Sequence, residues 1–212
     1  QRNHDTGPFS QTGNAIGKRA LKNTCLSYLN SLDDVNYQAI AQVQYDLQAN
    51  MTDVGAALQI LTGHKNSDIS APLLADFYQR WQHDSQVVCQ WFAMQAGANL
   101  PGRLTHVKAL LEHDAFDIRN PNKVRSLVGS FIRSAINFHC ADGSGYEFVA
   151  DMILRLDPIN PMIAANLAKP LGRFKPHTIH RQELMQAQLH RLSQAKLSSD
   201  VYEVVSKALA AS

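Results

Sequence analysis

Apolar residues recur every three or four positions along most of this chain, which is the spacing that places them on one face of an α-helix. No stretch longer than a few residues shows the alternation typical of a β-strand. The spacing predicts helices over residues 16–29, 35–47, 52–61, 71–82, 87–94, 101–113, 144–156, 179–192 and 199–209, with two more that begin at Pro121 and Pro161.

Residues that favour helix ends support these segments. Asn120-Pro121 and Asn160-Pro161 each place a strong N-cap residue before a proline at the first helical position, where the missing N–H costs nothing. We predict that Ser70 caps the helix over 71–82. About ten short helices with brief connections indicate an all-α fold, arranged as a superhelical, HEAT- or ARM-like stack of antiparallel helices. The sequence shows no repeat of fixed period.

The domain organisation follows from the same pattern. Residues 1–14 are polar and glycine-rich, and we interpret them as a loop or frayed end. Residues 15–212 are predicted to form a single helical domain, which suits a chain of 212 residues. The first residues lack both an initiator methionine and an apolar signal core, so we expect the chain to be part of a longer protein.

Composition narrows the classes of partner. The net charge is +2, which argues against binding to nucleic acid or to an anionic membrane surface. No apolar run approaches the roughly 18 residues that span a bilayer. Cys25, Cys89 and Cys140 are too far apart for a zinc ribbon, and their number does not suit a disulfide framework. We interpret them as reduced, mostly buried thiols of a cytoplasmic protein.

Candidate chemistry is sparse. Nine histidines are present, but the zinc-protease motif His-Glu-x-x-His is absent. His177 and His180 are a weak metal pair without a third ligand, and residues 112–114 (EHD) are better explained as a solvated helix end than as an acid–base group. Residues 142–146 (DGSGY) favour a turn with an N-cap over a phosphate-binding loop, since no lysine follows. We therefore predict neither a catalytic residue nor a metal site in this chain.

Several short motifs, in order along the chain, resemble one known family. They are KRALKNTCL (18–26), NMTD (50–53), WF (91–92), NPNKVRSLVG (120–129), FH (138–139), DGSGY (142–146), NP (160–161), YE (202–203) and KAL (207–209). Together they are similar to the carboxy-terminal helical domain of bacterial aminopeptidase N, in the M1 family of zinc aminopeptidases of the alanyl type. The resemblance extends from about Gly17 to Leu209.

This resemblance implies a function for the chain. Enzymes of the family remove single amino acids from the amino termini of peptides, and their zinc ligands and catalytic residues lie upstream of the helical domain. The resemblance therefore implies no cofactor in this chain and zinc in the parent enzyme. It also implies that the helical domain is a cap, which closes the active-site chamber, admits short peptides and is inactive alone. The expected partners are the upstream catalytic domain and the peptide substrate, and the first helices of the cap are expected to be missing.

The resemblance also implies two substrate-binding residues. Met162 matches a residue that lines the pocket for the first side chain of the substrate, and Arg125 matches an arginine that faces the chamber. On the helical wheel, Met162 lies off the apolar stripe, on a face with Asn166 and Lys169. The alternatives are a partly buried packing methionine and an arginine paired with a carboxylate. Asn166 departs from some relatives, which carry an arginine there.

Two further functions stay open. The chain could be a free-standing α-helical scaffold that binds other proteins, or it could itself be a hydrolase, for which it offers no nucleophile or metal triad. Both the cap and the scaffold would expose an apolar face rimmed by polar residues. We expect such a face on the isolated chain.

Overall fold

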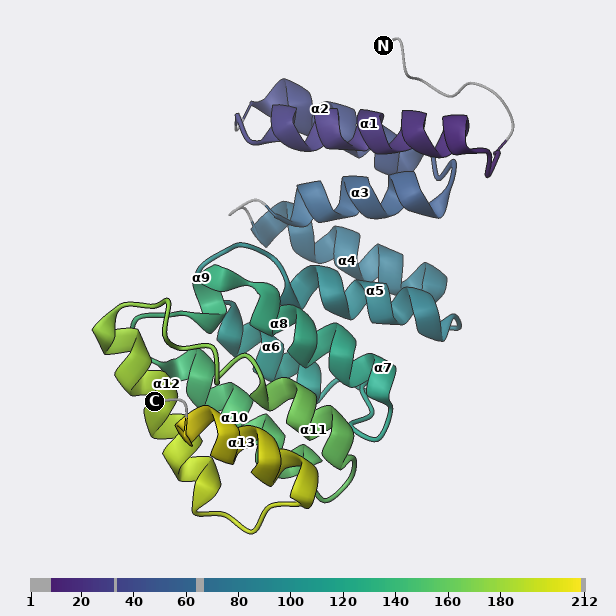
Figure 1. Ribbon diagram of the computed structural model, residues 1–212. Helices are drawn as coiled ribbons and strands as arrows, with labels where there is room; N and C mark the ends of the chain where they lie inside the picture. The colour runs from purple at the N-terminus through teal and green to yellow at the C-terminus, as the bar shows by residue number, and fades with distance from the viewer. Residues whose placement is uncertain (1–8, 33, 64–66, 211–212) are drawn as a thin grey trace. The chain divides into compact units, whose positions relative to one another are not determined.

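The computed structural model describes residues 9–32, 34–63 and 67–210, and every regular element in these ranges is a helix (Figure 1). The prediction of an all-α fold of short helices is confirmed. The elements are α1 (Gly13–Asn30), α2 (Val35–Asp46), α3 (Met51–Thr62), α4 (Ser67–Trp81), α5 (Ser85–Ala96), α6 (Arg103–Leu111), α7 (Pro121–Val124), the π-helix η1 (Arg125–Gly129), α8 (Ser130–Arg133), α9 (Ala135–Phe138), α10 (Ser144–Leu156), α11 (Pro161–Ala168), α12 (Ile179–Ser193) and α13 (Ser199–Ala210).

The chain divides into two compact units. Unit 1 spans residues 1–80 and unit 2 spans residues 81–212. The division falls at the end of α4, whose last residue already belongs to unit 2. The single domain predicted over residues 15–212 therefore stays a prediction, and each unit is described by itself.

A buried carboxylate ties the helices of unit 1 together. Asp53, near the start of α3, accepts hydrogen bonds from Lys22 Nζ (2.6 Å) and Asn23 Nδ2 (3.0 Å), both on α1. From α2, Gln44 Nε2 donates to the backbone carbonyl of Asp53 at 2.9 Å. The hydroxyl of Tyr45 on α2 donates a hydrogen bond to Asp76 Oδ2 on α4 at 2.8 Å. Polar contacts therefore link all four helices of this unit, in addition to its apolar core.

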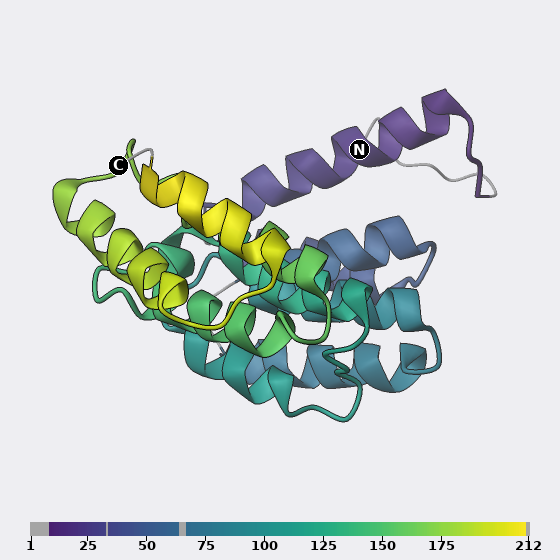
Figure 2. The same ribbon diagram turned by 60° about the horizontal axis from the view of Figure 1, so that its bottom comes forward.

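Helix α10 forms the centre of unit 2. It packs against α9, α11 and α12, while α13 packs on α11 and α12 (Figure 2). The side chains that α10 buries almost completely are Tyr146, Phe148, Val149, Met152, Ile153 and Leu156. The buried carboxylate of Asp157, which follows α10, accepts a hydrogen bond from Ser198 N at 2.8 Å and holds the start of α13 in place.

A second group of helices completes unit 2. Helix α5 packs against α6, η1 and α8. Its Phe92 is fully buried and makes edge-to-face contacts with the rings of Trp91, His113 and Phe116 at centroid separations of 5.1–6.0 Å. Such aromatic pairs add stability beyond the area that they bury.

Three sequence predictions need correction. Of the loop or frayed end predicted over residues 1–14, residues 1–8 lie outside the described residues. Residues 13 and 14 are helical rather than loop, because Thr12 caps α1 by accepting a hydrogen bond from Ala15 N. Helix α4 begins at Ser67, so Ser70 is a buried helical residue and not a cap, and Pro72 lies inside the helix. The cysteines are free as predicted, but Cys25 is exposed and the other two are only partly buried.

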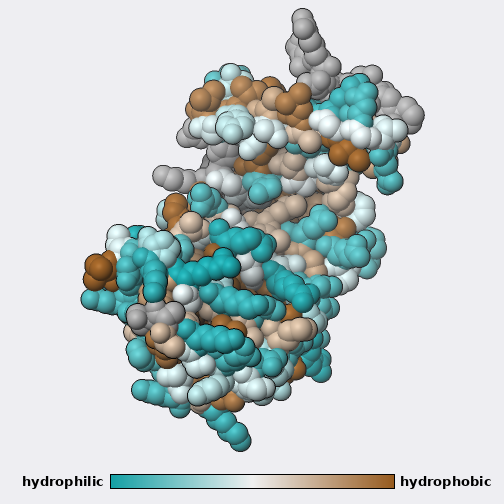
Figure 3. Space-filling model, in the orientation of Figure 1, coloured by the Kyte–Doolittle hydropathy of each residue, from teal (hydrophilic) through white to brown (hydrophobic). Residues whose placement is uncertain are grey.

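Exposed apolar side chains gather on the first two helices. Of the large apolar side chains that the described residues expose, ten of fifteen lie between residues 9 and 47. They are Phe9, Ile16, Leu21, Tyr28, Leu29, Leu32, Val35, Ile40, Val43 and Leu47. We call this surface the apolar face, and Figure 3 shows hydrophobic side chains over α1 and α2. The expected apolar face is thus present. Separately, none of the helices in the described ranges is both long and apolar enough to cross a bilayer.

Candidate substrate-facing site

Arg125 lies at the start of an irregular turn of helix. Asn120 caps α7 by accepting hydrogen bonds from Asn122 N and Lys123 N, and Pro121 occupies the first position as predicted. After one turn the helix widens into the π-helix η1, whose first residue is Arg125. Such π-turns are rare and occur frequently at functional positions.

The guanidinium group of Arg125 is exposed and lacks a carboxylate partner among the described residues. Its Nη1 donates to the side-chain oxygen of Asn122 at 3.4 Å, one turn earlier. Room beside it comes from Gly129, where an added Cβ atom would lie 4.0 Å from the Cβ of Arg125. A neutral amide satisfies one N–H but leaves the positive charge uncompensated, so Arg125 can meet an external anion. The alternative of structural pairing with a carboxylate is not what this geometry shows.

Met162 stands out from the packed side of α11. Asn160 caps this helix by accepting a hydrogen bond from Ile163 N at 3.1 Å. Ile163 and Leu167 are buried, while Met162 is 60% exposed. The position of Met162 that the helical wheel predicted, off the apolar stripe, is therefore confirmed. A flexible, polarisable side chain at this place can form an adaptable apolar wall.

Asn166 and Lys169 share the exposed side of α11 with Met162, as predicted from their spacing. Lys169 Nζ donates to Asn166 Oδ1 at 2.7 Å, and both residues are exposed. No hydrogen bond or ion pair within the described residues joins this group to Arg125. Met162 and Arg125 thus face solvent from separate elements of unit 2, and the structure alone does not bring them into one pocket.

The two histidines considered as a metal pair have separate partners. The ring of His177 lies against that of His139, with centroids 4.3 Å apart, whereas His180 Nε2 lies 2.9 Å from the backbone carbonyl of Ala141. Burial, with smaller contributions from the positive fields of His177 and Arg181, lowers the pKa of His139 and favours its neutral form. In the part of the chain that the structure describes, no three His, Cys, Asp or Glu side chains could together hold a metal ion.

The glycine-rich segment at residues 142–146 is a turn, as the sequence favoured. Asp142 Oδ1 accepts from Ser144 N at 3.0 Å, and Gly143 has a left-handed conformation with φ of 76°. Gly145 packs directly on backbone, because a Cβ atom there would lie 2.5 Å from the carbonyl oxygens of Asn137 and Phe138. The segment therefore forms a turn that lets the start of α10 pack closely on the backbone of α9, as the sequence favoured over a phosphate-binding loop.

Residues 112–114 lie at the end of α6, as the sequence indicated. Glu112 is the C-cap of α6. The ring of His113 packs 5.1 Å from that of Trp91, and its Nδ1 accepts a hydrogen bond from Ala115 N at 3.1 Å. These contacts match the expected role of the segment at a helix end.

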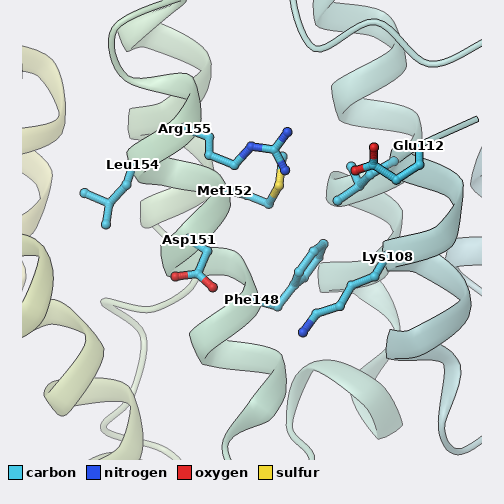
Figure 4. Close-up of a pocket in the computed structure, with 8 residues that line it drawn as sticks. Lys108, Glu112, Phe148, Asp151, Met152, Leu154 and Arg155 are labelled. Carbon is cyan, nitrogen blue, oxygen red and sulfur yellow. The ribbon is translucent and has the colours of Figure 1, made fainter.

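A groove of about 540 Å³ lies between α6 and α10 and was not predicted from the sequence (Figure 4). Phe148 and Met152 form its apolar floor, and Arg155 reaches across from α10 toward α6. Lys108 and Glu112 lie on the α6 side. The charges of the lining have both signs, and none of the residues that line the groove is a cysteine, serine or histidine. The groove offers apolar and charged contacts to a ligand, and the only sequence signal for it was the apolar face of α10.

Comparison with known proteins places these features in context. A family model described as a domain of unknown function (DUF3458_C) with ARM repeats matches residues 1–210. Aminopeptidase N of Haemophilus influenzae is 41% identical over 204 residues, which are 95% of this chain and 23% of that protein. Aminopeptidase N of Escherichia coli is 37% identical over 197 residues, which are 92% of this chain and 22% of that protein.

A solved aminopeptidase structure also matches this chain over part of its length. The crystal structure of Legionella pneumophila aminopeptidase A in complex with aspartic acid matches with a TM-score of 0.91 and 34% sequence identity. The match covers 100% of this chain and 26% of that one, so the chain spans about a quarter of the length of the relatives that it matches. The resemblance to the carboxy-terminal helical domain of bacterial aminopeptidase N is confirmed.

Proposed function

The chain belongs to the DUF3458_C family of ARM-repeat domains, and from this premise we propose that it is the cap domain of a zinc aminopeptidase. The parent enzyme would release amino-terminal residues from short peptides. The observation that carries the proposal is identity of 41% along 95% of this chain to less than a quarter of aminopeptidase N. In this role the domain closes the active-site chamber, limits access to it and lines part of the substrate pocket.

The described residues support a role without catalysis of its own. A catalytic zinc site needs three protein ligands around one ion. Among the described residues of unit 2, His139, His177 and His180 do not fit this requirement, since they contact rings and backbone rather than converging on one point. In line with the family resemblance, we propose that the zinc and the activated water belong to the upstream catalytic portion of the parent enzyme.

The two exposed site residues suit the wall of a chamber. Met162 presents an apolar, flexible surface to the first side chain of a peptide, and Arg125 presents an uncompensated positive charge to its carboxylates. Asn166 offers an amide in place of the arginine of some relatives, so its contact with an anion would be weaker.

The apolar face suits a surface that the rest of the polypeptide covers. Stacks of helical repeats stay soluble when their outermost repeat has a polar outer face. Here α1, α2 and the residues next to them instead expose ten large apolar side chains. We propose that the remaining three quarters of the parent enzyme bury this face, and that the enzyme works in the cytoplasm, where its three free cysteines stay reduced.

The decisive test measures bound zinc and aminopeptidase activity on this chain alone and after mixing with its catalytic portion. We expect no zinc and no turnover from the chain alone, because no group of three candidate ligands occurs among the residues that the structure describes. Activity should rise on mixing, since closure of the chamber orients the peptide. Zinc and turnover from the 212 residues alone would contradict the proposal. Complete indifference of the catalytic portion would instead favour the free-standing scaffold.

Substitution of Met162 tests the pocket assignment. In the reconstituted enzyme, Met162→Ala should change the relative kcat/KM for alanine, leucine, arginine and methionine substrates by several-fold, because the pocket loses one flexible wall. Stability should change by less than about 0.5 kcal/mol, since the side chain is exposed. The matched control is Ile179→Ala, which removes another exposed apolar side chain of unit 2. Equal effects of the two substitutions on preference would refute the assignment.

A further inference from the structure

Positive charge concentrates in two stretches of unit 2 that contain no acidic residue. Residues 118–141 and 158–182 together hold eight lysines and arginines and not one aspartate or glutamate. At the composition of the whole chain, about four acidic residues would be expected in 49 positions. The net charge of +2 therefore conceals a strongly uneven distribution.

Folding brings the two stretches into contact. The rings of His139 and His177, one from each stretch, lie 4.3 Å apart. Arg181 Nε donates to the backbone carbonyl of His139 at 3.1 Å. Figure 3 shows strongly hydrophilic side chains across the middle of unit 2, in the area where Figure 1 draws α8 and the link between α11 and α12. Six cations of these stretches are exposed, of which Arg119 pairs with Asp117 and Arg125 is described above. We call the other four the cationic face: Arg133, Lys169, Arg173 and Lys175.

The charges of the cationic face are not neutralised within the described residues. Arg133 donates to the hydroxyl of Ser130, and Lys169 donates to the amide oxygen of Asn166. By contrast, Arg191 and Lys207 elsewhere in unit 2 pair with carboxylates at 2.6 and 2.5 Å. A neutral oxygen satisfies a donor but leaves the charge in place, so the cationic face retains a positive field.

We propose that the cationic face binds the carboxylates of acidic peptides and draws them toward the substrate pocket. The inference deepens the proposed function, on which it rests, by naming a class of substrate: peptides with acidic residues behind the amino-terminal one and a free carboxyl terminus. Lys169 shares the exposed side of α11 with Met162, which connects the face to the proposed pocket. Clustered charge of one sign raises the association rate of an oppositely charged ligand.

The chemistry of the face favours a peptide over a nucleic acid. Binding of single strands uses exposed aromatic rings on which bases stack. The phenylalanines of the two stretches, Phe131, Phe138 and Phe174, are all buried. The planar guanidinium groups of Arg133 and Arg173 match the two oxygens of a carboxylate. Flexible lysines at positions 169 and 175 can follow several carboxylates along an extended chain.

A binding experiment on the whole 212-residue chain tests the proposal without catalysis. The probe is a fluorescent peptide with four glutamates and a free carboxyl terminus, measured by anisotropy at low and high salt. Its counterpart carries glutamines and a carboxamide, and a single-stranded oligonucleotide of equal charge is the third probe. We expect the glutamate peptide to bind at least about tenfold more tightly than its neutral counterpart, with the difference shrinking as salt screens the charges.

Matched variants locate the binding. Lys169→Gln, Arg173→Gln and Lys175→Gln together should weaken binding of the glutamate peptide about tenfold. The control triple, Lys108→Gln, Lys196→Gln and Lys207→Gln, removes the same charge from other exposed positions of unit 2 and should weaken it less than twofold. All six side chains are exposed, and thermal melting of each variant verifies that it folds.

The outcomes separate this inference from the proposed function. Equal losses in the two triples, or tighter binding of the oligonucleotide than of the peptide, would overturn the role of the cationic face. Selective binding with no activation of the catalytic portion would leave the face intact and refute the cap function instead. In the active reconstituted enzyme, the first triple should lower kcat/KM for the acidic peptide more than for the neutral one.

Discussion

At the scale of single residues, the close packing around Gly145 predicts that a larger side chain there would destabilise the fold. An alanine Cβ atom at this position would lie 2.5 Å from two backbone carbonyl oxygens, which cannot rotate away as a side chain would. Gly145→Ala should therefore destabilise unit 2 by about 1–3 kcal/mol, the usual cost of overpacking. Denaturant unfolding, followed by the fluorescence of the two tryptophans, measures this change.

Gly129 provides the control, because an added Cβ atom would have its nearest neighbours at 3.8 and 4.0 Å, in ordinary van der Waals contact. Gly129→Ala should leave the free energy of unfolding within about 1 kcal/mol of the wild type. If both substitutions cost the same, close packing of Gly145 on the carbonyls of Asn137 and Phe138 would not be the reason for its presence.

The sequence pattern predicted the position of some side chains but not the role of others. Helical spacing placed Met162 off the apolar stripe, and the structure confirms that it is exposed. The same pattern indicated a turn at residues 142–146, but it could not reveal why Gly145 is glycine. That reason depends on carbonyl groups of α9, which a sequence does not place beside α10. Local periodicity predicts which way a side chain points, whereas tertiary contacts decide what it meets.

At the scale of elements, the buried ion pair between α1 and α3 makes unit 1 sensitive to acid. Burial would raise the pKa of Asp53, but hydrogen bonds from Lys22, Asn23 and Asn50, with the charge of Lys22, outweigh burial and lower it. A carboxyl whose pKa is lower in the folded state contributes stability above its unfolded pKa of about 4 and loses it as pH falls through the folded value. The free energy of unfolding of unit 1 should therefore decrease as pH drops below about 4.

Unfolding curves of the wild type and of Asp53→Asn between pH 3 and pH 6 measure this contribution, with pH values chosen around the ordinary carboxyl pKa of about 4. The variant should be less stable at pH 6, and the gap between the two proteins should narrow toward pH 3. Asp46→Asn is the control, since its exposed carboxylate bonds only to Gln42 on its own helix among the described residues. A gap that stays constant with pH would contradict a role for the ionised carboxylate.

The elements themselves were largely predictable, and the exceptions have physical causes. Proline after asparagine located the starts of α7 and α11, because asparagine is a strong N-cap and proline is favoured at the first position of a helix. The widening of η1 at Arg125 was not predictable, since the spacing of apolar residues does not distinguish a single π-turn from an α-helical turn. Likewise, α4 extends before Pro72, although proline usually ends a helix.

At the scale of the whole molecule, surfaces were the least predictable features. The cationic face joins residues about forty positions apart, and the contact between His139 and His177 that unites them is absent from any local pattern. A count of acidic residues along the sequence would have found the two stretches, 118–141 and 158–182, but it would not have shown that they come together in the fold. The net charge of +2 argued only against binding to nucleic acid or to an anionic membrane surface. Charge averaged over a chain thus says little about charge on one face.

The exposure of the apolar face predicts that the isolated chain binds hydrophobic dye and self-associates. Ile40, Val43 and Leu47 lie on one side of α2 with 49%, 59% and 69% of their surface exposed. An apolar area of this kind that normally lies against other protein should bind a hydrophobic dye and drive self-association. Val43→Gln with Leu47→Gln should lower dye fluorescence and the scattering mass, while stability changes by less than about 1 kcal/mol because both side chains are exposed.

The control for this experiment removes exposed apolar side chains elsewhere, through Ile159→Gln with Ile179→Gln in unit 2. It should leave dye binding and association almost unchanged, because these residues lie outside the apolar face. The catalytic portion should also compete with the dye, since it belongs to the polypeptide that covers the face in the proposed enzyme. A wild-type chain that stays monomeric and binds no dye would show that α1 and α2 need no cover, and would remove the argument that they meet the rest of an aminopeptidase.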